Sequence, residues 1–328
     1  MSGGDPVRRA SRAAEDPSPE EWRALADPAV APAERRVLRE DLHFRAAWHD
    51  ARTLLGPGAA DAVRDLALLC LKPDAVVGRR GARILAFLEE HGGTPVAAAP
   101  IRFERRATYE LWRNDWVVYP VDRLAFCRFW YEAAEGLLLL VHMPARGAVS
   151  AARRLSAVKG SSLPRARRPT DLRTRLEPPN QVLNFVHVAD HPGDVLRELS
   201  ILLDPPARRA ALGEAAAQVR PEAARARVRA ALEAVEARNP RHDLLFAPAL
   251  ERLLASPAGP ILEAEVFARR PALRAGRAAA GLAGDEGVPW WTFEAAIAGA
   301  TLDHRARWDV VVVASELVAY EHADALQP

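Results

Sequence analysis

A histidine at the end of an apolar run is the residue of this sequence best suited to chemistry. Residues 183–190 read LNFVHVAD, which places His187 near the carboxyl end of an expected strand, and Glu198 follows in a helical pattern that starts at Pro192. Side chains at such strand ends project into the crevice beyond the sheet edge, where ligands of open α/β sheets collect. The imidazole is therefore a candidate nucleophile, although a lone histidine is more often a satisfied structural residue.

Four apolar runs predict the strands that must position this histidine. They lie at residues 66–71, 95–103, 137–141 and 183–190. Helical periodicity separates or follows them, at residues 82–91, 107–113, 126–135, 148–157 and 195–203. This alternation predicts an α/β (α+β) sandwich of the ferredoxin-like kind, with one sheet of about four strands that can pair antiparallel. The basic, proline-rich loop expected at residues 159–180 is unusually long for a compact domain, and such loops are often functional.

Helical patterns precede this central unit. Residues 1 to about 17 are rich in Gly, Pro, Ser and Arg and are expected to be loosely ordered, and Ser18-Pro19-Glu20-Glu21 is a helix-start signature. A helix is expected over residues 31–55, with core positions at Leu38, Leu42, Phe44, Ala47 and Trp48. We therefore expect a mostly helical N-terminal extension at residues 1–65 and a central domain at residues 66–204.

The last part of the chain, residues 205–328, is expected to be a mainly helical C-terminal extension. Its Ala-, Arg-, Glu- and Leu-rich segments have helical spacing, at residues 205–219, 221–238 and 243–254. The run WDVVVV at residues 308–313 is its first strand-like pattern. Both this run and the Trp290-Trp291 pair are expected in the core.

Composition narrows the class of protein. The 45 Lys and Arg residues nearly balance 43 Asp and Glu residues, so the net charge of +2 does not favour nucleic-acid binding. Cys70 and Cys127 lie in apolar surroundings and are expected to be buried, reduced thiols of a cytoplasmic protein. No run approaches the roughly 18 apolar residues of a membrane span, and the first residues lack a signal-peptide pattern, so we expect no membrane partner.

In their order and spacing, the motifs of residues 66–204 resemble those of the nucleoside diphosphate kinase family. They are Lys72-Pro73-Asp74, Gly81, Gly160-Ser161-Ser162-Leu163-Pro164, Arg173, and Asn184-x-x-His187-x-x-Asp190 with Glu198. The resemblance implies phosphoryl transfer from a nucleoside triphosphate such as ATP, through a phosphohistidine, to a nucleoside diphosphate or a related acceptor. Mg²⁺ is implied because di- and triphosphates are bound as metal complexes. A homo-oligomer is implied as well, because family members usually assemble as hexamers or tetramers.

The resemblance also implies the catalytic residues. His187 is the nucleophile, and Glu198 is the carboxylate that orients and stabilises its ring. Lys72 reaches the transferred phosphate. Arg173 and Arg154 bind phosphate oxygens through their planar guanidinium groups, although Arg154 lies farther from the following glycine motif than the family spacing.

Other positions concern the nucleotide and depart from the family pattern. Ser162 keeps the hydroxyl of the family's threonine, Trp112 stands where a tyrosine is usual, and Asn184 matches the asparagine that contacts the sugar. The Gly-Ser that follows the family's histidine is Val188-Ala189 here, and a base-stacking aromatic is expected near Tyr119. These changes affect the part of the site that would contact the sugar and base more than the part that would contact the phosphates.

Three other interpretations are open. The first is a nucleotide-binding scaffold or regulatory protein on a weakened kinase-like domain, with partner contacts made by the C-terminal helical extension. The second is a metal hydrolase built on His187, Asp190 and His191, although Pro192 disfavours the helical geometry that this spacing requires. The third is RNA binding by the loop arginines, which lack the interleaved aromatics of such sites. Those arginines are Arg165, Arg167, Arg168, Arg173 and Arg175.

Overall fold

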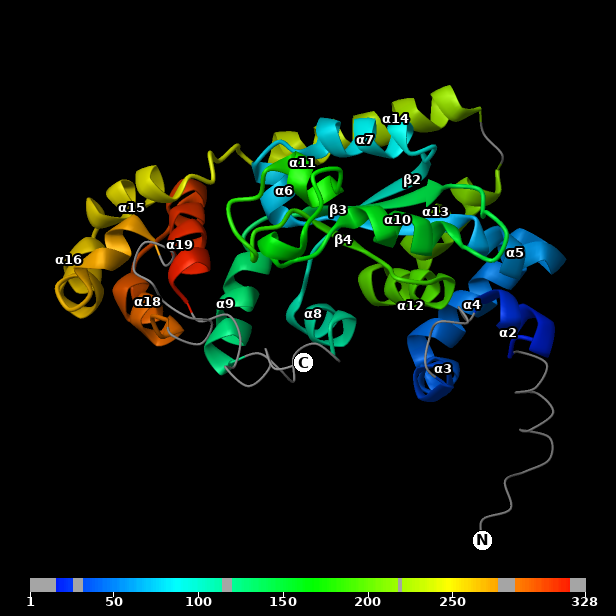
Figure 1. Ribbon diagram of the computed structural model, residues 1–328, viewed down its shortest axis with the longest axis horizontal. Coiled ribbons are helices and arrows are strands. Elements are labelled where there is room, and N and C mark those ends of the chain that lie inside the picture. Colours follow the sequence, from blue (N-terminus) through cyan, green and yellow to red (C-terminus); the bar gives the residue numbers. More distant parts are fainter. Residues whose placement is uncertain (1–15, 26–31, 114–119, 218–219, 277–286, 319–328) are drawn as a thin grey trace, which may run out of the picture.

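The computed structural model describes residues 16–25, 32–113, 120–217, 220–276 and 287–318. Its centre is a four-stranded antiparallel sheet in the order β2-β3-β1-β4, surrounded by helices (Figure 1). The strands are β1 (Leu66–Leu71), β2 (Thr94–Ile101), β3 (Gly136–His142) and β4 (Val186–Val188). The helix-rich α+β class is as predicted, and the fourth strand is shorter than the apolar run from which it was expected.

The two central strands explain why their sequences are apolar at every position. All six residues of β1 are buried, and in β3 only the terminal His142 is exposed. The strands pair antiparallel, with Leu68 opposite Leu140. Continuous apolar runs of this kind are typical of strands that are covered on both faces. Helices provide that cover from both sides of the sheet (Figure 1).

Among the described residues of this part of the chain, seven helices lie between the strands or directly after β4. They are α6 (Pro73–Val77), α7 (Gly81–Glu90), α8 (Arg105–Leu111), α9 (Val121–Tyr131), α10 (Ala151–Lys159), α11 (Leu172–Leu176) and α12 (Pro192–Leu202). The stretch 159–180 is therefore not an uninterrupted loop, because it contains α11 and a 3-10 turn, η3 (Pro164–Ala166). Helices α10 and α12 both pack against β1, and α10 also contacts β4.

The N-terminal helices begin as the sequence predicts but divide differently. Helix α2 (Pro19–Leu25) starts with a reciprocal cap, in which the Ser18 amide donates to Glu21 Oε2 at 2.7 Å and the Glu21 amide donates to Ser18 Oγ at 3.2 Å. The helix expected over residues 31–55 is two helices, α3 (Pro32–Glu40) and α4 (Leu42–Leu55). They are followed by η1 (Gly56–Gly58) and α5 (Ala59–Arg64). The loosely ordered segment expected at the N-terminus lies outside the described residues up to position 15.

Asp41 is the reason for the division. Its backbone is extended, and its Oδ1 accepts hydrogen bonds from the amides of His43 and Phe44, which makes it the N-cap of α4. Leu42 consequently lies on the first turn and is 76% exposed, which corrects its placement in the core. The other four expected core positions of this region are buried: Leu38, Phe44, Ala47 and Trp48.

Apart from an isolated β-bridge between Val288 and Val318, the described elements of residues 205–318 are helices. They are α13 (Pro205–Ala216), α14 (Pro221–Arg238), α15 (Phe246–Leu254), α16 (Gly259–Leu262), the π-helix η4 (Glu263–Phe267), the 3-10 helix η5 (Pro271–Ala275), α18 (Trp290–Ile297) and α19 (His304–Leu317). Helices α13 and α14 pack against β2, whereas α15 packs against α19. The division of the chain at residue 204 stays a prediction.

The strand-like run at residues 308–313 is part of helix α19. Asp303 caps this helix by accepting a hydrogen bond from the Ala306 amide at 2.7 Å, and the run is buried against α15 and α9. Capping and tertiary burial thus outweigh the strand preference of four consecutive valines. Trp290 is buried as expected, but Trp291 is 59% exposed. Among the described residues, no helix is long and apolar enough to cross a membrane.

Candidate active site

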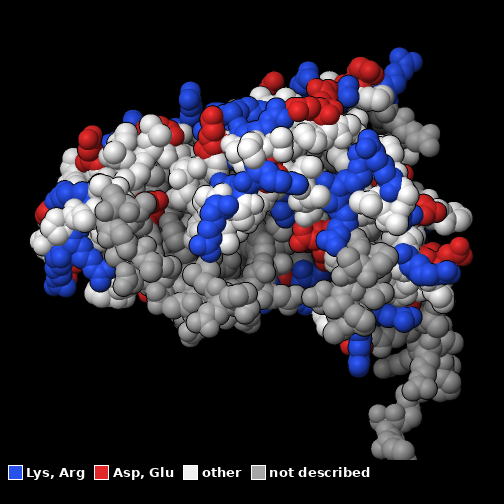
Figure 2. Space-filling model, in the orientation of Figure 1, with Lys and Arg blue, Asp and Glu red and all other residues white. Residues whose placement is uncertain are grey.

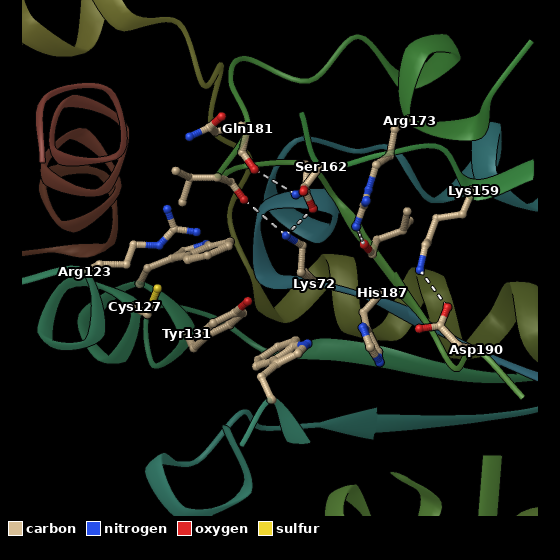
Figure 3. Close-up of a pocket in the computed structure, with 15 residues that line it drawn as sticks. Lys72, Arg123, Cys127, Tyr131, Lys159, Ser162, Arg173, Gln181, His187 and Asp190 are labelled. Carbon is tan, nitrogen blue, oxygen red and sulfur yellow. Dashed lines mark hydrogen bonds and ion pairs between the residues drawn. The ribbon is translucent and has the colours of Figure 1, made fainter. Parts of the chain in front are cut away.

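A cavity of about 210 Å³ lies where β4 and the residue after β1 meet the loop that carries α11. It is lined by residues from distant parts of the chain, including α9, α10 and the segments on both sides of β4 (Figure 3). Six of the predicted site residues line it together: Lys72, Trp112, Ser162, Arg173, Asn184 and His187. The motifs of the central domain therefore converge on one space.

His187 is presented to this cavity by β4 and held from behind by α12. It lies opposite Cys70 of β1, and its two strand neighbours are buried. Its Nε2 lies 2.9 Å from Oε2 of Glu198, whose side chain is buried, while the side chain of His187 is 16% exposed. Among the described residues, no hydrogen bond to Nδ1 is found. Because the carboxylate accepts the Nε2 proton, the Nδ1 lone pair of the neutral ring is the one that is available for chemistry.

The Lys72-Pro73-Asp74 motif fixes the chain just before this strand. The Lys72 amide donates to the carbonyl of Phe185 at 2.9 Å, and the Phe185 amide donates to Oδ2 of Asp74 at 2.8 Å. Phe185 has a φ of 71°, a left-handed conformation that is unfavourable for a bulky residue. The motif therefore positions His187 two residues downstream, in addition to supplying a lysine.

The Lys72 side chain is buried at the cavity. Its Nζ donates to Oδ1 of Asn184 at 2.6 Å and to the carbonyl of Val182 at 3.2 Å, and it lies 4.6 Å from the centre of the Trp130 ring. Burial lowers the pKa of Lys72 to about 8; nearby Asp74 opposes this shift. The lysine is therefore still mainly cationic at neutral pH.

Arg173 is brought to the cavity by the short helix α11. Its Nη1 donates to the carbonyl of Gly160 at 2.9 Å, and its Nη2 donates to the carbonyl of Val186 at 2.8 Å. Burial lowers the pKa of Arg173 to about 10. Gly160 has a φ of 85°, and a Cβ there would lie 2.7 Å from Cβ of Asp171, so this close approach requires glycine. The long loop thus folds back and fixes a guanidinium group against β4.

The remaining predicted residues have different surroundings. The Arg154 side chain donates to the carbonyl of Pro144 and does not line the cavity. Ser162 lies on the exposed rim of the cavity, whereas Asn184 is engaged with Lys72 and donates to the carbonyl of Gln181 at 2.8 Å.

An aromatic group forms another part of the wall. Trp112 stacks on Tyr131 and meets the His187 ring edge-on, with the Trp112 and His187 ring centres 5.4 Å apart. The base-stacking aromatic expected near Tyr119 lies outside the described residues.

Four further described lining residues carry charge or a phenol and were not assigned a role in phosphoryl transfer from the sequence. They are Arg123 and Tyr131 of α9, Lys159 of α10, and Asp190 (Figure 3). Lys159 immediately precedes the Gly160 motif, and Asp190 belongs to the histidine motif, so both were adjacent to a recognised signal. Burial raises the pKa of Asp190, but Lys159, Ser156 and His187 together hold it below its ordinary value.

The charge of the cavity is strongly unbalanced. Of the described residues that line it, four are cationic, Lys72, Arg123, Lys159 and Arg173, and one is a carboxylate, Asp190. Figure 2 shows that Lys and Arg side chains also gather on the face formed by α10, α11 and the loop between them. Clustered cations in a cleft with low-dielectric walls attract anions. Guanidinium and ammonium groups donate well to phosphate oxygens.

The metal-hydrolase interpretation receives no support from the geometry. His191 is the N-cap of α12, and both of its ring nitrogens face Asp194, at 3.3 Å from its amide nitrogen and 3.0 Å from its Oδ2. In the part of the chain that the structure describes, no group of three His, Cys, Asp or Glu side chains is placed to hold a metal ion.

Comparison with known proteins gives limited similarity. No protein-family model matches the sequence, and a search of curated proteins gives no match either. Among solved structures, the nucleoside diphosphate kinase of Aquifex aeolicus is similar to this chain with a TM-score of 0.36 and 16% sequence identity, over 43% of this chain and 96% of that one.

Proposed function

We propose that this protein is a phosphotransferase, which moves the terminal phosphate of a nucleoside triphosphate to His187 and then to a nucleoside diphosphate or a related acceptor. The observation that supports this most is the setting of the imidazole. Its Nε2 is held by the buried Glu198 at 2.9 Å, while the ring borders a cavity lined by Lys72 and Arg173. A phosphoryl-accepting histidine needs this combination of an oriented ring and cations that neutralise developing charge.

The topology of residues 66–204 supports the same proposal. The strand order β2-β3-β1-β4, with helices between the strands, agrees with a ferredoxin-like domain of the nucleoside diphosphate kinase type. Every residue assigned here to the site lies within this segment. The homo-oligomer, the protein partner of the C-terminal extension and the cytoplasmic location stay expectations.

The proposed chemistry consists of two displacements at phosphorus. In the first, Nδ1 of His187 forms a bond to the terminal phosphorus, and the bond from that phosphorus to the bridging oxygen breaks, leaving its electron pair on the nucleoside diphosphate. The Nε2 proton stays in the hydrogen bond to Glu198, and that carboxylate stabilises the positive charge of the phosphorylated ring. In the second, a terminal oxygen of the acceptor attacks the phosphorus and the electron pair returns to Nδ1.

The size of the cavity indicates which part of the nucleotide it holds. Its volume of about 210 Å³ is below the roughly 300–1,000 Å³ of typical small-molecule sites. The cavity therefore suits a phosphate chain, with the sugar and base outside it. In this arrangement Lys72 and Arg173 contact phosphate oxygens.

Mg²⁺ is proposed to enter with the nucleotide. Asp190 is the one carboxylate among the described lining residues, so the site fits an ion held mainly by phosphate oxygens and in part by Asp190. When bound, the ion neutralises phosphate charge.

A second candidate is nucleotide binding without turnover. It is favoured by the 2.6 Å hydrogen bond between Lys72 and Asn184, because Lys72 has to leave Asn184 before it can contact a transferred phosphate. Val188 and Ala189 are also completely buried where the family pattern has glycine and serine. This candidate predicts a binding signal with ATP but no covalent label.

Incubation with γ-labelled ATP tests the proposal directly. We expect label on the wild-type protein that is labile in acid and stable in base, as for a phosphohistidine, and none on His187→Ala. Transfer from the labelled protein to a panel of nucleoside diphosphates would then define the acceptor. Equal labelling of wild type and His187→Ala would refute the phosphohistidine, and ATP binding without any label would favour the second candidate.

A further inference from the structure

Helix α10 presents a different cation to the cavity from the one that the family resemblance favoured. Arg154 and Lys159 are five positions apart, and at about 100° per residue their side chains point about 140° apart around the helix. Arg154 donates to the carbonyl of Pro144, whereas Lys159 lines the cavity. The phase of one helix therefore brings Lys159 to the site and turns Arg154 away.

Lys159 is held loosely beside the nucleophile. Its Nζ lies 3.4 Å from Oδ1 of Asp190 (Figure 3). It also lies 3.4 Å from the carbonyl of Val188, the residue after His187. Both distances exceed the roughly 2.7–3.2 Å of ordinary hydrogen bonds. The hydroxyl of Ser156, one turn earlier on the same helix face, also donates to Asp190. The carboxylate therefore keeps a partner if Lys159 moves to a ligand.

The burial of the Lys159 ammonium group is unfavourable for the stability of the protein unless an anion binds beside it. Its side chain is only 15% exposed, and burial lowers its pKa, with Asp190 opposing the shift and Arg173 adding to it. Arg173 acts in the same direction on Lys72. Buried like charges around an open cavity are unfavourable for stability alone, so the arrangement fits a binding site for an anion.

We propose that Lys159 binds the transferred phosphate in the role that the family resemblance gave to Arg154, and that Asp190 holds the ammonium group in place until the ligand arrives. The identity of the ligand rests on the proposed function. On binding, Nζ exchanges Oδ1 of Asp190 for a phosphate oxygen, a short movement because both Asp190 and Val188 are close to His187 in the chain. Four cations, including Arg123, then surround the phosphate chain.

Two single substitutions compare the two candidate cations directly. Lys159→Met and Arg154→Met each remove one charge from α10, and Lys159→Arg restores the charge at the proposed position. Binding of inorganic tripolyphosphate without metal, measured by calorimetry, is the first readout. The rate of His187 labelling from γ-labelled ATP is the second.

We expect Lys159→Met to weaken tripolyphosphate binding by about 10- to 100-fold, the range for a hydrogen bond between charged groups, and to slow labelling. Lys159→Arg should recover most of the binding, and Arg154→Met should stay within about twofold of wild type, since its side chain lies outside the cavity. Thermal melting of each variant checks the fold. If Lys159→Met fails to fold, Lys159→Gln takes its place.

The outcomes separate this inference from the proposed function. Unchanged binding in folded Lys159→Met, or an equal loss in Arg154→Met, overturns the assignment of Lys159 even if His187 is labelled. Tripolyphosphate binding that depends on Lys159, with no labelling of the wild type, supports the assignment and contradicts the phosphotransferase. A wild-type protein that does not bind tripolyphosphate contradicts both.

Discussion

Two histidine–carboxylate pairs of this molecule have the same length and opposite surroundings. Beside the sheet, His187 lies 2.9 Å from Glu198, and among the C-terminal helices, His242 lies 2.9 Å from Asp309. The His242 side chain is 1% exposed, its Nδ1 accepts the amide proton of Leu244 at 3.0 Å, and Arg252 donates to Asp309. Both ring nitrogens of His242 are therefore engaged.

His187 differs from His242 in having a ring nitrogen that is not hydrogen-bonded to the described residues and that can act as a nucleophile. Its Nδ1 makes no hydrogen bond with the described residues, and cationic side chains line the cavity that its ring borders. A carboxylate on a histidine is thus not sufficient to identify a nucleophile. The open nitrogen and the charge of the space beside it make the difference, and four predictions test this contrast.

The largest expected effect is on His187→Ala. Without the nucleophile, transfer between nucleotides should fall by at least about a thousandfold, because the binding cations cannot replace a covalent carrier. Coupled nucleotide assays measure this, with circular dichroism to verify the fold. Transfer close to the wild-type rate would mean that the two histidines do not differ in the proposed way.

His242→Ala should show the opposite behaviour. Removing a buried ring with two hydrogen bonds should lower the free energy of unfolding by about 3 kcal/mol. Transfer per folded molecule should be unchanged, since the ring belongs to the C-terminal network. Urea denaturation and activity at a temperature where the variant is folded provide both values; an inactive but folded variant would show that the networks are coupled.

The carboxylates give a smaller contrast. Glu198→Gln keeps an acceptor for Nε2 but loses the negative charge that stabilises the phosphorylated ring, so we expect transfer to slow by about 30- to 100-fold. Asp309→Asn should instead lower the melting temperature and leave the rate unchanged. Identical rate losses in both variants would remove the distinction.

The smallest effect concerns pH. Because the pKa of Lys72 is lowered to about 8, its cationic form decreases as pH rises through 8, and transfer should fall about tenfold between pH 7 and pH 9. Lys72→Arg should keep the positive charge over this range, so its transfer rate should not fall between pH 7 and pH 9. If the wild-type rate does not change over this range, or if the fall persists in Lys72→Arg, then the titration of Lys72 does not control the rate of transfer.

The titration of Lys72 also changes the free energy of unfolding with pH, in a direction that follows from its lowered pKa. The pKa of a lysine in the unfolded chain is about 10.4, so between pH 8 and that value the unfolded chain binds the Lys72 proton more firmly than the folded protein does. The contribution of Lys72 to the free energy of unfolding therefore rises with pH across this window. Activity and this part of the stability should change in opposite directions.

Patterns that report burial could be predicted from the sequence. The run at residues 66–71 forms β1 with the expected bounds, because a strand covered on both faces must be apolar throughout. The motif order likewise placed Lys72, Arg173 and His187 around one cavity. In both cases the signal lies in short local patterns, although the motifs that meet at the cavity are far apart in the sequence.

Features that depend on orientation or on distant contacts could not be predicted in this way. The choice between Arg154 and Lys159 depends on which face of α10 meets β1 and β4, and the motif spacing does not report that phase. The valines of residues 310–313 became helical because Asp303 caps α19 and other helices bury it. Asp41 divides the helix expected over residues 31–55 because its side chain caps α4, and the sequence pattern did not indicate these hydrogen bonds.

The left-handed Phe185 has a consequence for how the imidazole is aimed. Strand β4 is three residues long, too short to fix its own register, yet the residue just before it is clamped at both its amide and its carbonyl by the turn that follows β1. The direction of the His187 ring is therefore set by the turn after the first strand of the sheet, more than a hundred residues earlier in the chain. Strain at Phe185, on the order of 1–3 kcal/mol, accompanies this alignment.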